Sequence, residues 1–389
     1  MDALKIENLD SKEKKWVVRH STVSNLMTQS DPLLYLLIAK WRLGPVWAYV
    51  IFSLVPLTSE SIFCFFRGCL ITTSKFIGMW NDYLNFSNFI LFFPVIFTLY
   101  VWLPTGIEDI FGALKLNEII PLTKKNRQAL IRFDNYKERL LKDKFWVFMT
   151  IFLVVVVDAL LIFPGTNKFV VWWNYYTFTF FSHQIVIAVM LYAAIFSIIR
   201  ISQFILLLRF FFNEVKIDIK PLHPDGCGGL RPLGGFSVNL GYVLGALGTS
   251  VILTVYFQSY LLGGNLGDFV WPPAIVLFIS VYSVCAPVVF FAPIGTAHKA
   301  MREAKERELL VISKQFELDY ENMMKSLPSK TNIVITAIEK IEQLKRLYRI
   351  VQDFPVWPFN IQNLVRFVVS VLGPFILSIF PTILSLVLK

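Results

Sequence analysis

Long apolar runs alternate with charged connections along the chain, and this pattern predicts membrane-crossing helices. A helix needs about 20 apolar residues to cross roughly 30 Å of hydrocarbon. Runs of about that length or longer lie at residues 46–66, 85–103, 145–164, 177–208, 236–262, 269–297 and 365–388. We therefore expect an all-α fold, that of a polytopic α-helical membrane protein with about seven transmembrane helices.

The last run carries Pro374 and Pro381, so two topologies fit it. A full crossing agrees with its length and its lack of charge, and it gives seven spans. A kinked, re-entrant segment gives six spans with both termini on the same side. We favour the crossing.

Positive charge is concentrated in alternate connections. Lys and Arg number 31 in residues 1–42, 105–144, 209–235 and 298–350, and 3 in the connections between the other pairs of runs. Because positive connections remain on the cytoplasmic side, we expect a cytoplasmic N-terminus and contacts with anionic lipid headgroups. The first 40 residues contain no apolar core segment, which predicts that there is no cleavable signal peptide.

This organisation divides the chain into four parts. They are a cytoplasmic N-terminal segment (1–42), a transmembrane domain (43–297), a cytoplasmic helical hairpin (298–360) and a C-terminal transmembrane helix (361–389). Leu309, Ile312 and Phe316 recur at helical spacing in the hairpin, and Pro328 breaks the pattern. The hairpin either packs on itself in solvent or forms an oligomerisation or partner surface. The basic, helix-forming pattern of residues 105–144 predicts a helical segment along the inner membrane surface.

The composition agrees with a membrane protein. Of the residues, 56% are hydrophobic and 16% are charged, and the mean hydropathy is +0.60, whereas soluble domains are about a quarter charged. A net charge of +10 would suggest nucleic acid in a soluble protein. Here topology accounts for the charge, and we expect no nucleic-acid partner. The four cysteines have no paired spacing, which predicts that there is no disulfide framework.

Ionisable residues inside the apolar runs are costly to bury, so they are the first functional candidates. Asp158 lies past the midplane of the third run, and His183 lies six residues into the fourth. At similar depth on consecutive antiparallel helices, such a pair would relay protons, bind a cation or gate a pore. A helix–helix hydrogen bond is the structural alternative. Glu60 would add a second carboxylate, or it would mark a polar break in the first helix.

Other features of the runs predict packing and anchoring. The fourth run is longer than a bilayer requires, and Arg200 and Arg209 at its basic end are expected to contact lipid headgroups. Gly241 and Gly245 form a GxxxG step, which predicts close helix packing or, alternatively, a gating hinge.

The stretch "LHPDGCGGLRPLGG", residues 222–235, has three competing interpretations. As an anion or headgroup site, it would use the peptide N–H groups of its glycines and the charge of an arginine. As a metal site its spacing matches no zinc pattern. As a structural turn it would pack against inner-surface elements, and this is the interpretation that we favour. The anion candidates are Gly226, Gly228, Gly229 and Arg231, and the metal candidates are His223, Asp225, Cys227 and His298.

Sequence motifs give no enzymatic chemistry. The chain contains no GxSxG, HExxH or nucleotide-binding motif, and the sequence identifies no cofactor. We therefore predict an ion channel or small-solute transporter that forms a homo-oligomer, with the hairpin and the glycine-rich loop as a regulatory inner layer. The alternatives are a membrane-embedded enzyme acting on a lipid-linked substrate at the inner face and a non-conducting membrane receptor or scaffold.

Overall fold

The computed structural model describes most of the chain, and the predicted all-α class is confirmed for that part. The described residues are 22–116, 119–121, 123–162, 171–219, 223–261, 273–326, 331–358, 364–366 and 368–369. Within these ranges, β pairing is limited to an isolated bridge between Ile77 and Val171. The predicted span at 365–388 lies almost entirely outside the described residues.

The helices begin and end close to polar capping residues where the sequence supplies them. Side-chain oxygens of Thr22, Asp31 and Thr123 accept backbone N–H groups at the starts of α3, α4 and α8. The first half of the chain forms α3 (Val23–Ser30), α4 (Pro32–Leu34), η1 (Tyr35–Lys40), α5 (Pro45–Arg67), η2 (Met79–Asn81), α6 (Tyr83–Ser87), η3 (Asn88–Phe92) and α7 (Phe93–Leu116). The second half forms α8 (Lys124–Lys142), α9 (Phe145–Ile162), α10 (Trp172–Tyr175), α11 (Thr177–Glu214), α12 (Arg231–Leu261), α13 (Pro273–Ser326) and α14 (Thr331–Gln352).

Three helical stretches in the described residues are long and apolar enough to cross a membrane. They are Pro45–Arg67, Asn85–Leu114 and Thr177–Glu214. The apolar window of Asn85–Leu114 is 67% buried in the protein, against 17% for Pro45–Arg67. Helix α7 is therefore central, while α5 keeps an apolar outer surface.

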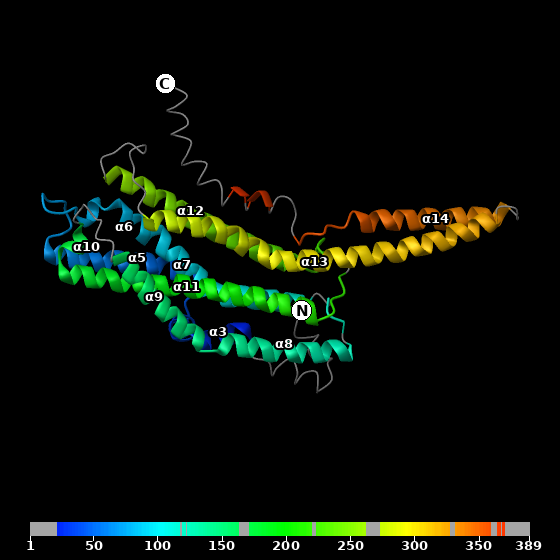
Figure 1. The fold of residues 1–389 in the computed structure, drawn as a ribbon, viewed down its shortest axis with the longest axis horizontal. Helices are drawn as coiled ribbons and strands as arrows, with labels where there is room; N and C mark the ends of the chain where they lie inside the picture. The colour runs from blue at the N-terminus through cyan, green and yellow to red at the C-terminus, as the bar shows by residue number, and fades with distance from the viewer. Residues whose placement is uncertain are drawn as a thin grey trace, which may run out of the picture.

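The long helices run along one another, and one pair extends beyond them (Figure 1). Helices α5, α11 and α12 each pack against α7, and α9 packs against α11. We call the end that holds α8, residues 223–230 and the start of the α13–α14 projection the hairpin end. The opposite end, which holds α10 and Cys64–Cys69, is the disulfide end.

Helix α7 is longer than its sequence suggests. The second apolar run ends at residue 103, but the helix contains Pro104 and continues to Leu116. Ile107, Ile110 and Leu114 are buried in the main core, so tertiary packing offsets the hydrogen bond that proline removes. The predicted basic segment 105–144 is therefore divided between the end of α7 and the separate helix α8.

Helix α13 is also continuous where a boundary was expected. Its 54 residues cover the predicted sixth span and the first arm of the hairpin, with Pro287 and Pro293 inside. Helix α14 returns antiparallel to it (Figure 1), and an ion pair of 2.8 Å joins Lys340 to Asp319 across the two arms. The apolar first half and the charged second half thus form one helix.

The cysteine spacing predicts no disulfide framework, but it misses one disulfide bond. Cys64 and Cys69 are bonded to each other, and both are fully buried. Between them α5 ends at Arg67, and its C-cap Gly68, with a left-handed φ of +66°, turns the chain back. Spacing alone missed the bond because the turn, rather than a CxxC motif, brings the sulfur atoms together.

Candidate functional site

Glu60 lies on α5 in a turn rich in hydroxyl groups. The hydroxyls of Thr58, Ser59 and Ser61 each donate to a carbonyl oxygen three or four residues earlier, at 2.7–3.0 Å. These groups are satisfied by the helix itself. Helix α5 therefore continues through Glu60, and the polar residues do not interrupt it.

The Glu60 carboxylate faces α11, where it meets two polar side chains. Ser182 Oγ donates to its carboxylate oxygens at 3.0 and 3.2 Å. His183 Nδ1 lies 3.9 Å from Glu60 Oε1 and has no hydrogen-bond partner. Glu60 is 1% exposed and His183 is 3% exposed. The structure thus brings together two of the three predicted intramembrane residues.

Aromatic rings enclose the His183 imidazole. Trp173 stacks on it at a centroid distance of 5.1 Å, and Trp172 and Phe89 meet it edge-on at 5.5 and 6.3 Å. These rings keep the imidazole away from water. Loss of water disfavours a charged imidazole. An aromatic face attracts a cation, so Trp173 and Glu60 would together offset part of this cost for a protonated His183.

Trp172 is held in place by Asp82, a residue that sequence reasoning missed. The Asp82 carboxylate accepts hydrogen bonds from Trp172 Nε1 at 3.0 Å and from the Asn85 backbone N–H at 3.2 Å. The Trp172 backbone N–H donates to the Ile77 carbonyl oxygen at 2.8 Å. The three-residue spacing from Asp82 to Asn85 is a helix-capping signal, but the contact with Trp172 spans 90 positions.

A cavity of about 350 Å³ opens beside Glu60 between α5 and α11. Phe178, Phe181 and Ile185 line it and are exposed on the outer surface, so it opens on the side that would face lipid. Its other lining residues are Ser59, Glu60, Phe63, Ser182 and Val186. A mostly apolar wall with a few convergent polar groups is typical of a small-molecule site.

Asp158 does not join this cluster. It lies on α9, which packs against α11, yet its buried Oδ1 has no hydrogen-bond partner. His183 Nδ1 is likewise unpaired, so the predicted Asp158–His183 hydrogen bond is not formed. The imidazole faces α5 instead.

Arg200 is buried in the protein and does not contact lipid headgroups, which corrects the sequence interpretation. It is 3% exposed. Its Nη1 donates to Gln203 Oε1 at 2.7 Å and to the Leu141 carbonyl oxygen at 3.2 Å, and its Nη2 donates to Ser30 Oγ. The end of α3 and the end of α8 thus contact this part of α11. Arg209, in contrast, is exposed.

Asp31 lies in the same buried network as Arg200, where burial raises the pKa of its carboxyl and the charge of Arg200 partly opposes that rise. It is 0% exposed. Its carboxylate accepts hydrogen bonds from Tyr192 Oη at 2.9 Å, from Tyr100 Oη, and from the Leu33 N–H at 3.0 Å. These bonds tie α4, α7 and α11 together. Neither Asp31 nor the two tyrosines stand out in the sequence, because their partners are far apart in the chain.

The glycine-rich loop folds around its own aspartate. Asp225 Oδ1 accepts the N–H groups of Cys227 at 2.8 Å and Gly229 at 2.9 Å, and Oδ2 accepts that of Arg231 at 3.2 Å. His223 Nδ1 lies 2.9 Å from Oδ1. Burial alone would raise the pKa of the Asp225 carboxyl, but these hydrogen bonds lower it. The Gly229 amide, one of the candidates for an external anion, therefore binds an internal carboxylate.

The glycines of this loop allow a tight joint. Gly226, Gly228 and Gly229 have left-handed φ values of +66°, +65° and +89°, which glycine adopts without strain. A Cβ added at Gly228 would lie 2.4 Å from Ile219 Cγ2 and 3.0 Å from Phe354 Cζ. The loop thus packs between the segments that follow α11 and α14.

The four candidate metal ligands do not converge. In the part of the chain that the structure describes, no three His, Cys, Asp or Glu side chains are grouped to hold a metal ion. His298 Nδ1 lies 2.8 Å from the Val356 carbonyl oxygen, and its ring stacks on Trp357. Burial raises the pKa of the Cys227 thiol, which keeps it protonated and a poor ligand.

Comparisons of the chain with models of known protein families, with curated proteins and with solved structures find no match. The function is therefore inferred from the geometry above. Each of the two polar clusters contains a buried nitrogen without a hydrogen-bond partner, Arg200 Nε in one and His183 Nδ1 in the other. Glu60 in addition adjoins a cavity. The Glu60–His183 cluster is the candidate site.

Proposed function

We propose that the protein transports a small solute or ion across a membrane, and that Glu60 and His183 form its proton-binding site. The observation that carries this proposal is the buried carboxylate–imidazole contact of 3.9 Å between α5 and α11. Both helices are long and apolar enough to cross a membrane. Ionisable groups inside such helices commonly mark ion or proton pathways.

The pair can hold a proton in two places. A proton on His183 gives an imidazolium that faces both Trp173 and the Glu60 carboxylate. A proton on Glu60 leaves both groups neutral. A solute in the adjoining cavity would contact Ser182 and Glu60, so its binding would be linked to the position of the proton. Because Glu60 and His183 are almost fully buried, a conformational change must expose them, which favours a carrier over an open channel.

We further propose seven spans with the N-terminus and the hairpin end in the cytoplasm. The asymmetry of Lys and Arg supports this orientation. The Cys64–Cys69 bond at the opposite end also supports it, since disulfides persist in oxidising compartments outside the cytosol. Anionic lipid headgroups would then contact the hairpin end. Val311 and Leu318, exposed one heptad apart on α13, support a homo-oligomer through the hairpin.

The test is proton flux through the reconstituted full-length protein. Liposomes containing the protein and a trapped pH-sensitive dye are given a membrane potential with potassium and valinomycin. We expect proton uptake above that of empty liposomes, and at least a tenfold loss of that uptake in Glu60→Gln and His183→Gln. Asp109→Asn makes the same carboxylate-to-amide change at an exposed position of α7 and is expected to retain the flux.

Three outcomes would contradict parts of this proposal. Wild-type protein that moves neither protons nor Na⁺, K⁺ or Cl⁻ would exclude the transport function. Proton flux that survives both site variants would exclude Glu60 and His183 as the binding site. Unitary currents through the wild-type protein would show that it is a channel and not a carrier.

A further inference from the structure

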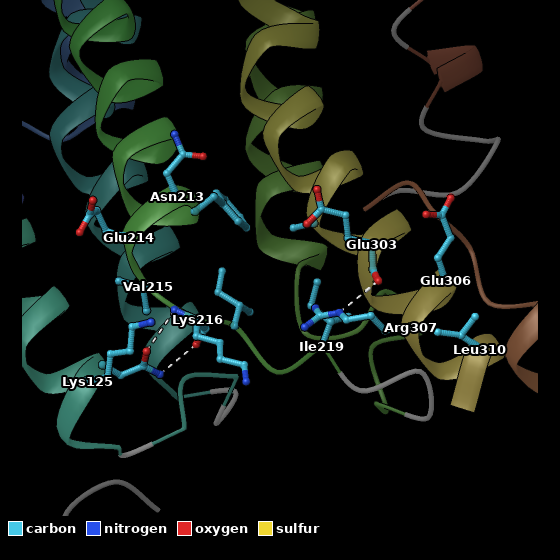
Figure 2. Close-up of a pocket in the computed structure, with 14 residues that line it drawn as sticks. Lys125, Asn213, Glu214, Val215, Lys216, Ile219, Glu303, Glu306, Arg307 and Leu310 are labelled. Atoms are coloured by element: carbon cyan, nitrogen blue, oxygen red, sulfur yellow. Dashed lines mark hydrogen bonds between the residues drawn. The ribbon is translucent and has the colours of Figure 1, made fainter. Parts of the chain in front are cut away.

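A second cavity, of about 670 Å³, lies at the hairpin end, far from Glu60 in the chain. We call it the basic cleft. Figure 2 shows its two walls: Lys125, Glu214 and Lys216 lie on the side of α8 and α11, and Arg307 extends from α13 on the other. Its remaining lining residues are Asn126, Phe212, Asn213, Val215, Ile217, Ile219, Ala300, Glu303, Glu306 and Leu310.

The acidic residues of the cleft are already matched by positive charge. Each of the three glutamates has a basic neighbour that does not itself line the cavity. The pairs are Glu214–Arg132 at 3.1 Å, Glu306–Arg302 at 2.8 Å and Glu303–Lys299 at 4.0 Å. The carboxylates therefore contribute little net negative charge to the space between the walls.

The basic residues of the cleft have no such match. Within the described ranges, Lys125, Lys216 and Arg307 form no ion pair with a carboxylate. Arg307 Nε donates to the Glu303 carbonyl oxygen at 3.2 Å, and its two terminal nitrogens make no hydrogen bond to a described residue. Three cationic groups from two walls thus remain available to an anion.

The wall that carries the lysines is fixed in position. The buried Asn126 side chain accepts the Lys216 N–H at 3.1 Å and donates to the Lys216 carbonyl oxygen at 2.9 Å, as the dashed lines in Figure 2 show. A third bond, of 2.8 Å, joins Asn126 to the Pro121 carbonyl oxygen. Lys125 lies in the first turn of α8, where the helix dipole adds positive potential.

We propose that the basic cleft binds a phosphate-bearing ligand through Lys125, Lys216 and Arg307. The guanidinium fork suits phosphate oxygens, and the two ammonium groups add charge from the opposite wall. A volume of about 670 Å³ is that of a small-molecule site. Apolar residues such as Phe212, Ile219 and Leu310 would contact the organic part of the ligand. The phosphate comes either from a lipid headgroup or from a soluble compound.

The experiment uses the full chain in phosphatidylcholine nanodiscs and has two arms. In the first, sodium pyrophosphate is titrated into the nanodiscs by calorimetry. In the second, phosphatidylglycerol is added to the nanodiscs, and lipid that remains bound to the protein is counted by native mass spectrometry. The variants are Lys216→Gln and Arg307→Gln. Lys314→Gln, an exposed position on α13 outside the cleft, is the matched control.

We expect each cleft variant to weaken binding about tenfold, because each removes one charge-assisted contact, and the control to bind as the wild type does. Arg302→Gln tests the balance of charge in the cleft. Arg302 does not line the cleft, but without it the Glu306 carboxylate loses its ion pair and would repel an anion. This change is therefore also expected to weaken anion binding.

The two arms distinguish the sources of the phosphate. Pyrophosphate binding that depends on the cleft residues supports a soluble ligand. Lipid retention with the same dependence, and no pyrophosphate binding, supports a headgroup. The proposal is overturned if Arg307→Gln and Lys216→Gln, eluting as the wild type does in size-exclusion chromatography, bind as the wild type in both arms, or if Lys314→Gln weakens binding equally.

Discussion

Two arginines on α11 show how strongly the surroundings of one residue type can differ along one helix. Arg200 is 3% exposed and makes three hydrogen bonds to protein, whereas Arg209 is exposed. Removing one member of a buried charge network costs about 3–5 kcal/mol because the remaining groups lose their partner. Exposed substitutions usually change stability by less than about 0.5 kcal/mol.

We therefore expect Arg200→Ala to lower the free energy of unfolding by about 3 kcal/mol and Arg209→Ala to leave it almost unchanged. Denaturant unfolding of the detergent-solubilised protein, followed by circular dichroism, measures both. Equal effects of the two substitutions would show that the network around Asp31 does not stabilise the fold.

At this scale the sequence draws attention to candidate residues but does not predict which side chains they contact. Glu60 and His183 stand out because charge is rare inside apolar runs. Depth in the membrane can be estimated from sequence position, but the rotation of a helix about its own axis cannot. The sequence therefore pairs His183 with Asp158 on the preceding long helix, whereas the structure turns it towards Glu60, 123 positions earlier.

At the scale of elements, two glycines of the glycine-rich loop allow the cost of backbone strain to be measured apart from the cost of crowded packing. Gly226 and Gly228 have nearly the same φ, +66° and +65°. An added Cβ meets nothing within 4 Å at Gly226, but at Gly228 it would lie 2.4 Å from Ile219 Cγ2. Both substitutions to alanine incur left-handed strain of about 1–2 kcal/mol.

Gly228→Ala is expected to destabilise the protein by a further 1–3 kcal/mol or so relative to Gly226→Ala, because only the former forces neighbouring side chains to move. Thermal unfolding of the two variants checks this difference. If their stabilities were the same, the loop would not be packed against Ile219 and Phe354.

Helix existence follows from the apolar pattern, but helix length does not. Pro104 is a stop signal in isolation, and charges after residue 297 suggest a new element. In the structure α7 passes the proline and α13 passes the change in composition. In both cases the buried face continues at helical spacing, as Ile107, Ile110 and Leu114 do on α7, and tertiary contacts decide the boundary.

At the scale of the whole molecule, the proposed orientation makes a direct prediction. Lys75 lies at the disulfide end and Lys314 lies on the projecting hairpin, and both are exposed. In intact cells, a membrane-impermeant maleimide is expected to label Lys75→Cys, and to label Lys314→Cys only after permeabilisation. Cys227 is buried, so background labelling of this native cysteine should be low. The reverse labelling pattern would show that the topology is opposite to the one proposed.

The continuity of α13 also has a mechanical consequence. From Pro293 to Ser326 the helix extends about 50 Å, at 1.5 Å per residue, with no break in its hydrogen-bonded axis. A tilt of about 5° at the proline would therefore displace the far tip by roughly 4 Å. Helix α13 would thus act as a lever arm. A small tilt among the apolar helices would move the tip of the hairpin by several ångströms, enough to change its contacts with a bound molecule.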